Sequence, residues 1–363
     1  MATSTTDTPR DVRGTMNSSD PLPLTVEGLT ASWFTKILGK PVKNVTVIDT
    51  IHGTASKILI KLTFEDSTND RICVKGGFNA AILANFPIFF AIYRLEAEFY
   101  YHLAPKIKIP LPPTIYAGTD TVNGQGIVIL ADLKARGYTF GNPLKTWTVD
   151  LVQKGVEQLA TLHASTWGQK QEDIPWASKT LSFRDAIVGL MMPEEWDKRF
   201  AKDTRPPVPD FMEDRERIAA LYEVLWNYEP KLKCILHGDA HIGNTFISPD
   251  GEPGFLDWQI VHVGSAMHDV TWFVIGSLSI QDRRNHEKEL LQAYLDALHR
   301  AGGPKLQLEE VWDEYRTYVF YGFSWCLAGP MMQTREVVDA MTERHCAAIV
   351  DHKSIELLEG VEK

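Results

Sequence analysis

The sequence predicts an α+β fold in which strands dominate the first third of the chain and helices the remainder. Apolar and polar residues alternate over residues 42–51 and 57–64, as they do in half-buried strands. From residue 148 onward, apolar residues recur at steps of three and four, as on the buried face of a helix. With 363 residues, 44% of them hydrophobic and 23% charged, the chain can bury a sizeable core.

The bulk composition argues against several classes of protein. The net charge of −10, from 37 basic and 47 acidic residues, disfavours a nucleic-acid-binding surface. The four cysteines lack the paired spacing of a zinc site or a disulfide framework, which indicates buried, inert thiols. The most apolar run, residues 80–93, contains Asn85 and Pro87 and is too short for a membrane span. We expect a cytoplasmic protein without a membrane or nucleic-acid partner, and its oligomeric state is left open.

The first 21 residues are expected to form a disordered tail, because they are rich in Ser, Thr and Asp and lack the apolar segment of a signal peptide. A short helix follows over residues 30–38, capped by Thr30 and ended by Gly39. The further elements predicted in this part are a third strand over residues 71–75, a helix around 94–100 that ends before Pro105, a proline-rich connector over 110–116 and a buried strand over 126–130.

The turn between the first two strands contains small residues. Gly53 and Ser56 lie in the run His-Gly-Thr-Ala-Ser over residues 52–56, where backbone amides could approach a phosphate. An ordinary hairpin turn explains the same residues. The chain contains no match to the GxxxxGK[ST] phosphate-binding loop.

Helices are predicted over much of the remaining chain. One begins at Thr148 and carries His163 on its apolar stripe, where packing is the favoured role for a histidine. Residues 171–215, rich in Pro, Trp and acidic residues, indicate an irregular insertion or short helices. Further helices are predicted over residues 271–280, 284–301, 308–327 and 334–360.

The residues that indicate chemistry are concentrated between positions 234 and 259. Two short strands, residues 245–247 and 255–256, are predicted on either side of a Pro-Asp-Gly turn. Asp239 and Asn244 precede this hairpin and Asp257 follows it, so its folding brings the three side chains together. Two carboxylates and an amide suit Mg²⁺ carrying phosphate, because this ion prefers oxygen ligands. One carboxylate can then accept a proton from an attacking hydroxyl.

The spacing of these residues resembles a known catalytic signature. His237-x-Asp239, four further residues, Asn244 and then Asp257-Trp258 is similar to the motif of the aminoglycoside phosphotransferase/choline kinase-like superfamily, and closest to its ecdysteroid-kinase-like (CHK) branch. The resemblance implies a protein-kinase-like two-lobed fold. It places a small nucleotide-binding N-lobe, an antiparallel sheet plus a helix, at residues 22–130, and a larger, mostly helical C-lobe at residues 131–363.

The resemblance also implies roles for the residues of the catalytic stretch. Asp239 is expected to be the general base, and His241 to stand near the transferring phosphoryl group. Asn244 and Asp257 are expected to hold Mg²⁺. Asp269 is expected to bond the backbone of the catalytic loop, and as a helix N-cap it would also have an ordinary role.

In the N-lobe the same resemblance identifies residues that would bind ATP. Lys75 matches the phosphate-pairing lysine, and Glu96 matches the glutamate that holds it, with Glu98 as the second candidate. By chain order, Leu130 to Asp132 correspond to the hinge whose backbone reads the adenine edge.

The predicted function is therefore ATP-dependent transfer of the γ-phosphoryl group to a hydroxyl of a small molecule. The alternative is a catalytically inactive kinase-like module that only binds nucleotide. A metallophosphoesterase is disfavoured, since its additional Asp-x-His and Gly-Asn-His motifs are missing, and no protein-kinase activation segment is recognisable.

The sequence does not identify the acceptor. Aminoglycosides, amino alcohols, sterols and polyketides stay open. Trp325, Met331, Met332 and Gln333 either line an acceptor pocket or belong to a core stripe.

Overall fold

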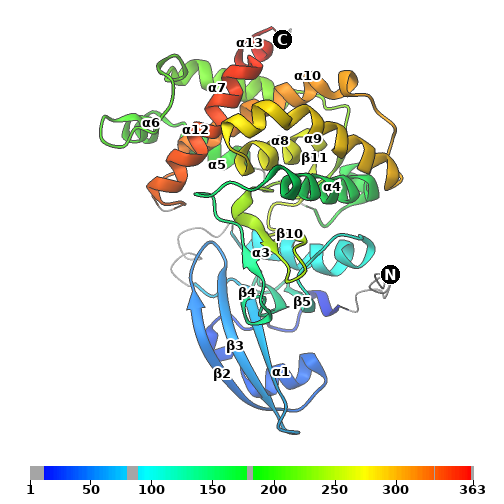
Figure 1. The fold of residues 1–363 in the computed structure, drawn as a ribbon. Helices are drawn as coiled ribbons and strands as arrows, with labels where there is room; N and C mark the ends of the chain where they lie inside the picture. Colours follow the sequence, from blue (N-terminus) through cyan, green and yellow to red (C-terminus); the bar gives the residue numbers. More distant parts are fainter. Residues whose placement is uncertain (1–11, 80–88, 178–182, 331, 361–363) are drawn as a thin grey trace. The chain divides into compact units, whose positions relative to one another are not determined.

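The computed structural model describes residues 12–79, 89–177, 183–330 and 332–360 of the chain (Figure 1). They form two compact units. The first unit comprises the chain up to Thr139 together with Trp176–Ser178 and Leu256–Val261. The second comprises Phe140–Pro175, Lys179–Phe255 and the chain from His262 onward. The domain borders predicted at 21/22 and 130/131 stay predictions.

The first unit is built on a six-stranded sheet. Strands β2 to β6 are antiparallel to their neighbours, whereas β1 is parallel to β5. In sheet order the strands are β1 (Arg13–Ser18), β5 (Thr114–Asp120), β6 (Gly126–Ala131), β4 (Asn69–Gly76), β3 (Ser56–Phe64) and β2 (Val42–Ile51). The four strands predicted from alternation or apolar content are confirmed.

Two strands contradict the sequence-based expectation. Disorder was expected over residues 1–21, but Arg13–Ser18 form β1, and the expectation is wrong for these six residues. Their strand exists because the edge of β5 supplies its hydrogen-bond partners, which composition cannot reveal. The connector expected over residues 110–116 is also too long, since β5 begins at Thr114, directly after the last proline.

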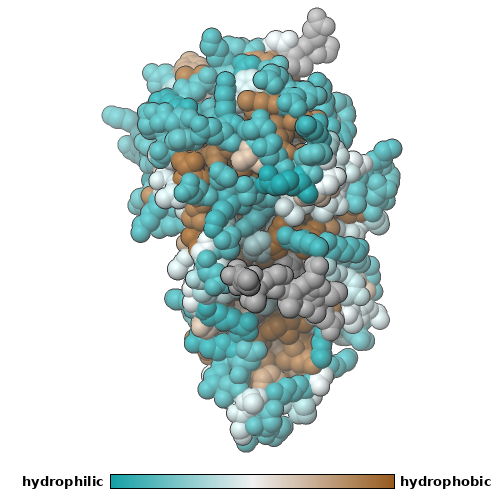
Figure 2. Space-filling model, turned by 45° about the vertical axis from the view of Figure 1, so that its right-hand side comes forward, coloured by the Kyte–Doolittle hydropathy of each residue, from teal (hydrophilic) through white to brown (hydrophobic). Residues whose placement is uncertain are grey.

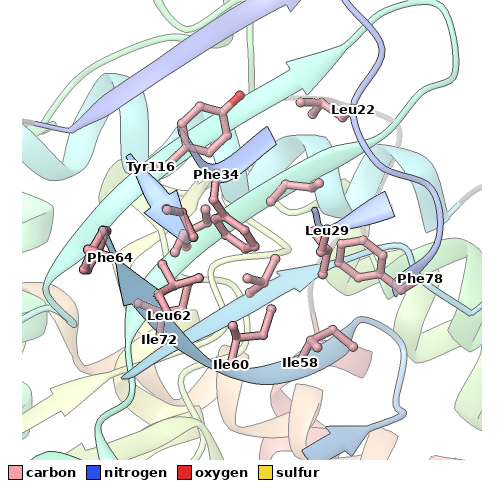
Figure 3. Packing of buried hydrophobic residues seen from close by; sticks show 14 residues of the cluster. Leu22, Leu29, Phe34, Ile58, Ile60, Leu62, Phe64, Ile72, Phe78 and Tyr116 are labelled. Atoms are coloured by element: carbon pink, nitrogen blue, oxygen red, sulfur yellow. The ribbon is translucent and has the colours of Figure 1, made fainter. Parts of the chain in front are cut away.

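A hydrophobic core lies between helix α1 (Ala31–Leu38) and the sheet. Phe34 is fully buried among the side chains of β3 and β4, including Ile58 and Ile60 (Figure 3). The helix begins where predicted, because Thr30 Oγ1 accepts a hydrogen bond from the Trp33 amide. It ends at Gly39, which adopts the left-handed conformation.

Helix α3 (Phe89–Glu98) packs against β5 and β6 and continues into a π-helical turn (Phe99–Leu103). A Cβ atom at Gly126 would lie 2.3 Å from the carbonyl oxygen of Tyr93, so only glycine lets the helix approach β6 this closely. The predicted helix around 94–100 is present and ends before Pro105, where a 3-10 turn (Ala104–Lys106) follows.

The second unit is mostly helical, as expected for the larger part of this fold class. Its helices are α4 (Val149–Ser165), α5 (Phe183–Leu190), α6 (Pro193–Phe200), α7 (Arg215–Asn227), α8 (Ala266–Ser277), α9 (Ile280–Arg300), α10 (Leu308–Val319), α11 (Ser324–Leu327), α12 (Arg335–His352) and α13 (Ser354–Glu359). Short 3-10 turns include η6 (Asp210–Met212), η7 (Ile242–Asn244) and η8 (Phe320–Phe323).

Helix α4 packs against α8 and α9 (Figure 1). Gly155 of α4 faces Phe273 of α8, where a Cβ atom would lie 2.3 Å from the aromatic ring. The helix predicted from Thr148 onward is confirmed, and Thr148 caps it, because its Oγ1 accepts a hydrogen bond from the Leu151 amide. Helix α8 begins earlier than the predicted residue 271, and Ser265 caps it. The expected N-cap role of Asp269 is therefore wrong: this residue lies inside the first turn.

Two strand pairs border the candidate catalytic loop. Strand β8 (Lys233–Leu236) pairs antiparallel with β11 (His262–Ser265), which was not predicted. Strand β9 (Thr245–Ile247) pairs with β10 (Pro253–Phe255), which confirms the predicted hairpin. The second strand begins at residue 253, two residues before its predicted start. The short β7 (Thr139–Phe140) lies where the chain passes from the first unit to the second.

The four cysteines are free thiols; Cys234, Cys326 and Cys346 are buried as expected, whereas Cys73 is half-buried. Burial raises the pKa of the Cys73 thiol to about 11 and raises the pKa of the Cys234 thiol well above its usual range. Most of the surface visible in Figure 2 is hydrophilic. Among the residues that the structure describes, no helix combines the length and the apolar character that a membrane crossing requires.

The position of Phe34 yields a first prediction. Phe34→Ala leaves a cavity between α1 and the sheet and is expected to lower the free energy of unfolding by about 3–5 kcal/mol. Phe211→Ala is the matched control, because that ring is 53% exposed, and we expect a change within about 0.5 kcal/mol. Urea denaturation followed by circular dichroism measures both. Equal losses would contradict the packing described for α1.

Candidate active site

A buried carboxylate shapes the loop that follows β8. Asp269 of α8 is fully buried and accepts hydrogen bonds from the amides of His237 (2.7 Å) and Gly238 (2.9 Å). Its Oδ2 also lies 3.2 Å from Nε2 of His163, and His163 Nδ1 lies 2.9 Å from the hydroxyl of Tyr294. Asp269 therefore contacts the loop backbone as expected, and His163 is a packed, hydrogen-bonded residue.

The charge of Asp269 is stabilised despite its burial. Burial alone would raise the pKa of this carboxyl group, but the His163 ring and the neighbouring histidines outweigh it and lower the pKa to about 2. The carboxylate is consequently ionised over the physiological pH range. The amides of His237 and Gly238 therefore donate to an anionic acceptor at these pH values.

The loop presents Asp239 with both carboxylate oxygens engaged. Oδ2 accepts a hydrogen bond from Nδ2 of Asn244 at 3.0 Å, and Oδ1 accepts one from the indole Nε1 of Trp272 at 3.1 Å. His241 Nε2 lies 3.8 Å from Oδ2. The structure thus brings together three of the predicted site residues, Asp239, His241 and Asn244, within the second unit.

Asn244 is placed by the turn η7 that leads into the hairpin. Its amide nitrogen Nδ2 also donates to the main-chain oxygen of Asp239 at 3.0 Å. The carbonyl oxygen Oδ1, which is the atom that could bind a cation, is thus not the atom that contacts Asp239.

In the first unit, Lys75 lies between two carboxylates. Its ammonium group is 2.8 Å from Oε2 of Glu96 and 2.9 Å from Oδ1 of Asp257. Lys75 and Glu96 are buried, with side chains 5% and 3% exposed, whereas the Asp257 side chain is 25% exposed. Burial disfavours the charged ammonium, but the carboxylates of Asp257 and Glu96 outweigh it and raise the pKa of Lys75. Burial raises the pKa of Glu96 against the attraction of Lys75.

Of the two glutamates considered as the partner of Lys75, the structure has Glu96 in that position. Glu96 contacts Lys75, while Glu98 forms an ion pair with Arg94 at 3.0 Å. Asp257 has a positive φ of 67°, which is a rare conformation for a residue with a side chain. The next residue, Trp258, stacks on Phe99 with 3.9 Å between ring centroids and holds the segment in place.

The turn between β2 and β3 is held by side chains rather than open. Ser56 is buried, and its hydroxyl lies 3.1 Å from Nδ1 of His52. The hydroxyl of Tyr93 on α3 donates to the main-chain oxygen of Thr54. Gly53 is exposed at the tip of the turn. Phosphate binding by Gly53 and Ser56 stays a prediction.

The hinge residues assigned by chain order take part in the sheet. Leu130 lies opposite Cys73 and Thr114 in the two neighbouring strands. The Asp132 amide donates to the main-chain oxygen of Arg71 at 3.1 Å, and its carboxylate lies 2.8 Å from the Arg71 guanidinium. The Asp132 amide is therefore engaged within this unit, and adenine recognition by residues 130–132 stays a prediction.

Sequence reasoning missed the indole that contacts Asp239. Trp272 stands in an apolar run that predicted only a buried helix, and its position three residues after Asp269 was the available signal. Met331 lies outside the described residues. Trp325 is buried and stacks on Trp272, with 5.4 Å between the ring centroids, so it belongs to the core of the second unit.

The first comparison with known proteins concerns the family. The family model described as the ecdysteroid kinase-like family matches residues 60–303, a region that contains Lys75, Glu96 and the catalytic stretch. The chain belongs to the ecdysteroid kinase-like family. It is thereby a member of a kinase-like group of small-molecule phosphotransferases, as the spacing of its motif predicted. No protein with a curated description matches the sequence.

Solved structures show the same fold. The GDP complex of aminoglycoside 2′-phosphotransferase-IIIa matches with a TM-score of 0.51 and 12% identity, covering 88% of this chain and 96% of that one. A protein from Ralstonia eutropha described as an aminoglycoside phosphotransferase also has a TM-score of 0.51, with 13% identity over 92% of this chain and 98% of its own. The predicted protein-kinase-like α+β fold is confirmed.

Asp269 provides a prediction that depends on pH. Asp269→Asn removes the anionic acceptor of the two loop amides and is expected to lower the free energy of unfolding by about 2–4 kcal/mol. Because the folded-state pKa is lowered to about 2, the wild-type advantage is complete above the pKa of the unfolded state. It is lost only as the pH falls toward 2. Urea denaturation at pH 7, 5 and 3 tests this.

The exposed Asp296→Asn serves as the control for this experiment, with an expected change within about 0.5 kcal/mol. A wild-type advantage that grows on acidification from pH 7 to pH 5 would contradict the assigned charge of Asp269.

Lys75 provides a second prediction about the site. Lys75→Met leaves two carboxylates without their cation and is expected to cost about 3–5 kcal/mol of stability. Lys57→Met is the matched control, since Lys57 lies directly opposite Lys75 in the sheet but is exposed. The double variant Lys75→Met, Glu96→Gln should recover part of the loss, because one buried charge is then removed. Thermal and urea denaturation of the wild type, Lys75→Met, Glu96→Gln, the double variant and the Lys57→Met control measure this coupling, and strictly additive losses would contradict it.

Proposed function

We propose that this protein is an ATP-dependent phosphotransferase that moves the γ-phosphoryl group to a hydroxyl of a small molecule. The observation that carries the proposal is the buried Lys75 ammonium group held by Glu96 and Asp257. Burying a lysine with two carboxylate partners costs desolvation free energy, so the cluster indicates a function rather than a contribution to stability. In kinase-like folds, such a lysine pairs with phosphate oxygens. Membership of the ecdysteroid kinase-like family supports the same activity.

Asp239 is proposed as the general base. Its Oδ2 accepts a hydrogen bond from the Asn244 amide and its Oδ1 one from the Trp272 indole, so neutral donors orient the carboxylate that would receive the hydroxyl proton. His241, close to Oδ2, is proposed to stand near the transferring phosphoryl group as a donor. Phosphoryl transfer needs positioning and charge neutralisation, which these residues can supply without a covalent intermediate.

Magnesium is the proposed metal, with Asn244 and Asp257 as its protein ligands. The donor set fits this ion: one amide oxygen and one partly exposed carboxylate are hard oxygen ligands, and Mg²⁺ usually combines few protein ligands with water and phosphate oxygens. When bound, the ion would neutralise charge on the phosphates. Within the described parts of the chain, no three His, Cys, Asp or Glu side chains gather into a metal site, so nucleotide oxygens would have to complete the coordination.

The nucleotide is proposed to be ATP, bound through Lys75, the turn with Gly53 and Ser56, and the backbone near Leu130 and Asp132. The related aminoglycoside 2′-phosphotransferase-IIIa was solved with GDP, so GTP is included in the test. We propose a hydroxylated small molecule as the acceptor and the cytoplasm as the compartment, without nucleic-acid or membrane partners.

Loss of ADP release in Asp239→Asn is the central prediction. The variant removes the proposed base and is expected to lower kcat by about 10²–10⁴-fold. Binding of ATP and Mg²⁺ should be retained, since Lys75 and Asp257 are unchanged. The measurement is a coupled assay of ADP release from ATP, or of GDP release from GTP, over a library of hydroxylated metabolites, with a thermal-shift assay for nucleotide binding. Asp250→Asn, in the exposed turn of the hairpin, is the matched control and should keep full activity.

Two outcomes would overturn parts of the proposal. Wild-type protein that binds ATP and Mg²⁺ but never releases ADP would support the inactive nucleotide-binding module instead. Wild-type activity that Asp239→Asn leaves intact would remove Asp239 as the base.

A further inference from the structure

The second unit contains a buried indole that contacts the proposed base but has no role in the mechanism described above. Trp272 Nε1 donates a hydrogen bond to Oδ1 of Asp239 at 3.1 Å, and the Trp272 side chain is only 6% exposed. We propose that Trp272 is a positioning residue, whose indole N–H fixes the orientation of the Asp239 carboxylate. This inference rests on the proposed role of Asp239 as the general base.

Helix α8 links this contact to the shape of the catalytic loop. Trp272 is the third residue after Asp269, so the two side chains lie at neighbouring positions on one helix face. Asp269 binds the amides of His237 and Gly238, while Trp272 binds the side chain of Asp239, the next residue of the loop. A single rigid helix turn therefore fixes both the backbone of the loop and the carboxylate that it carries.

The indole is itself held in a fixed orientation by aromatic neighbours. Trp325 stacks on it at 5.4 Å between centroids, with 16° between the planes. Tyr321 and His345 pack against it, each with 5.1 Å between centroids. Because buried rings cannot change rotamer without displacing these neighbours, the N–H direction is set by packing rather than by the carboxylate. The donor is thus in place before substrate binds, as preorganisation requires.

The chemistry of an indole suits this task. It is a neutral donor without acceptor capacity, so it cannot take the proton that the base receives. A lysine or arginine in its place would bind the carboxylate more strongly but would also reduce its proton affinity by a full positive charge. Trp272 therefore orients Asp239 at a small cost in basicity.

Three titratable groups that pack against Trp272, beside Asp239, are neutral at physiological pH. Burial, aided by Arg344 and His241, lowers the pKa of His345 to about 3, and burial lowers the pKa of His268 to about 4. Burial and the charge of Asp239 raise the pKa of Tyr321. Among the described residues, further titratable groups near this region include His237 and His241 of the loop, Asp269 of α8 and Arg344 of α12.

An activity-independent experiment tests the contact. In ¹⁵N–¹H spectra of the full chain, the indole resonance of Trp272 is identified by its loss in Trp272→Phe, or in Trp272→Tyr if the first variant does not fold. Asp239→Asn should shift this indole proton upfield, because a neutral amide accepts a weaker hydrogen bond than a carboxylate. An unchanged Trp272 resonance in Asp239→Asn would overturn the proposal even if the protein has no kinase activity.

The kinetic arm separates positioning from packing. Trp272→Phe should lower kcat roughly 10- to 100-fold, with the KM for ATP unchanged. Trp325→Phe is the matched control: it shortens the other ring of the stacked pair, whose Nε1 has no hydrogen-bond partner in the described structure. The control should lose much less kcat than Trp272→Phe. Equal losses of kcat in both variants would show a packing role only and would overturn the proposal.

Discussion

One buried ammonium group joins three segments of the first unit that lie far apart in the sequence. Lys75 comes from β4, Glu96 from α3 and Asp257 from the segment after the hairpin. An unpaired ammonium group in a protein interior is strongly unfavourable. The positions of the three segments therefore depend on one another. The contact also explains an unusual feature of the chain: residues Leu256–Val261 belong to the first unit, although the residues on either side belong to the second. The ion pair of Asp257 and the stacking of Trp258 on Phe99 anchor this excursion.

In the second unit, a buried negative charge holds separate parts of the chain together. There a buried carboxylate, Asp269, collects backbone and imidazole N–H donors and thereby fixes the loop that carries Asp239. The two clusters differ in what they hold. The ammonium group fixes side chains of distant segments, whereas the carboxylate fixes a stretch of main chain, which has no side-chain signal of its own. A loop with few backbone partners would otherwise sample many conformations, and each would place the base differently.

The sequence predicted those parts of the molecule that depend on local pattern. Thr30, Gly39 and Thr148 define helix ends through their own side chains or backbone, and the hairpin after Asn244 follows from its Pro-Asp-Gly turn. Strand β1 was missed because its partner, β5, lies about a hundred residues away and no local feature reports it. The contact between Trp272 and Asp239 was missed for a similar reason: an indole in an apolar helix predicts burial, but the direction of its N–H depends on tertiary packing. The pairing of Lys75 with Glu96 was predicted only through family resemblance, since two glutamates on one helix were equally possible by spacing.

The difference in exposure between the two partners of Lys75 separates their tasks. The two carboxylates differ in how easily they can leave Lys75 for another partner, because the Glu96 side chain is 3% exposed whereas the Asp257 side chain is 25% exposed. Moving Glu96 away from Lys75 would leave a charge in a dry environment, and burial already raises its pKa. Asp257 can instead turn one oxygen toward water or a cation at lower cost, and its positive φ makes its backbone conformation less favourable than that of an ordinary residue. Since one ammonium group already faces two carboxylates, the cluster as a whole carries a net negative charge, which would repel a bound triphosphate. A divalent cation held in part by Asp257 would offset that repulsion, which is why the proposed function includes magnesium together with the lysine rather than the lysine alone.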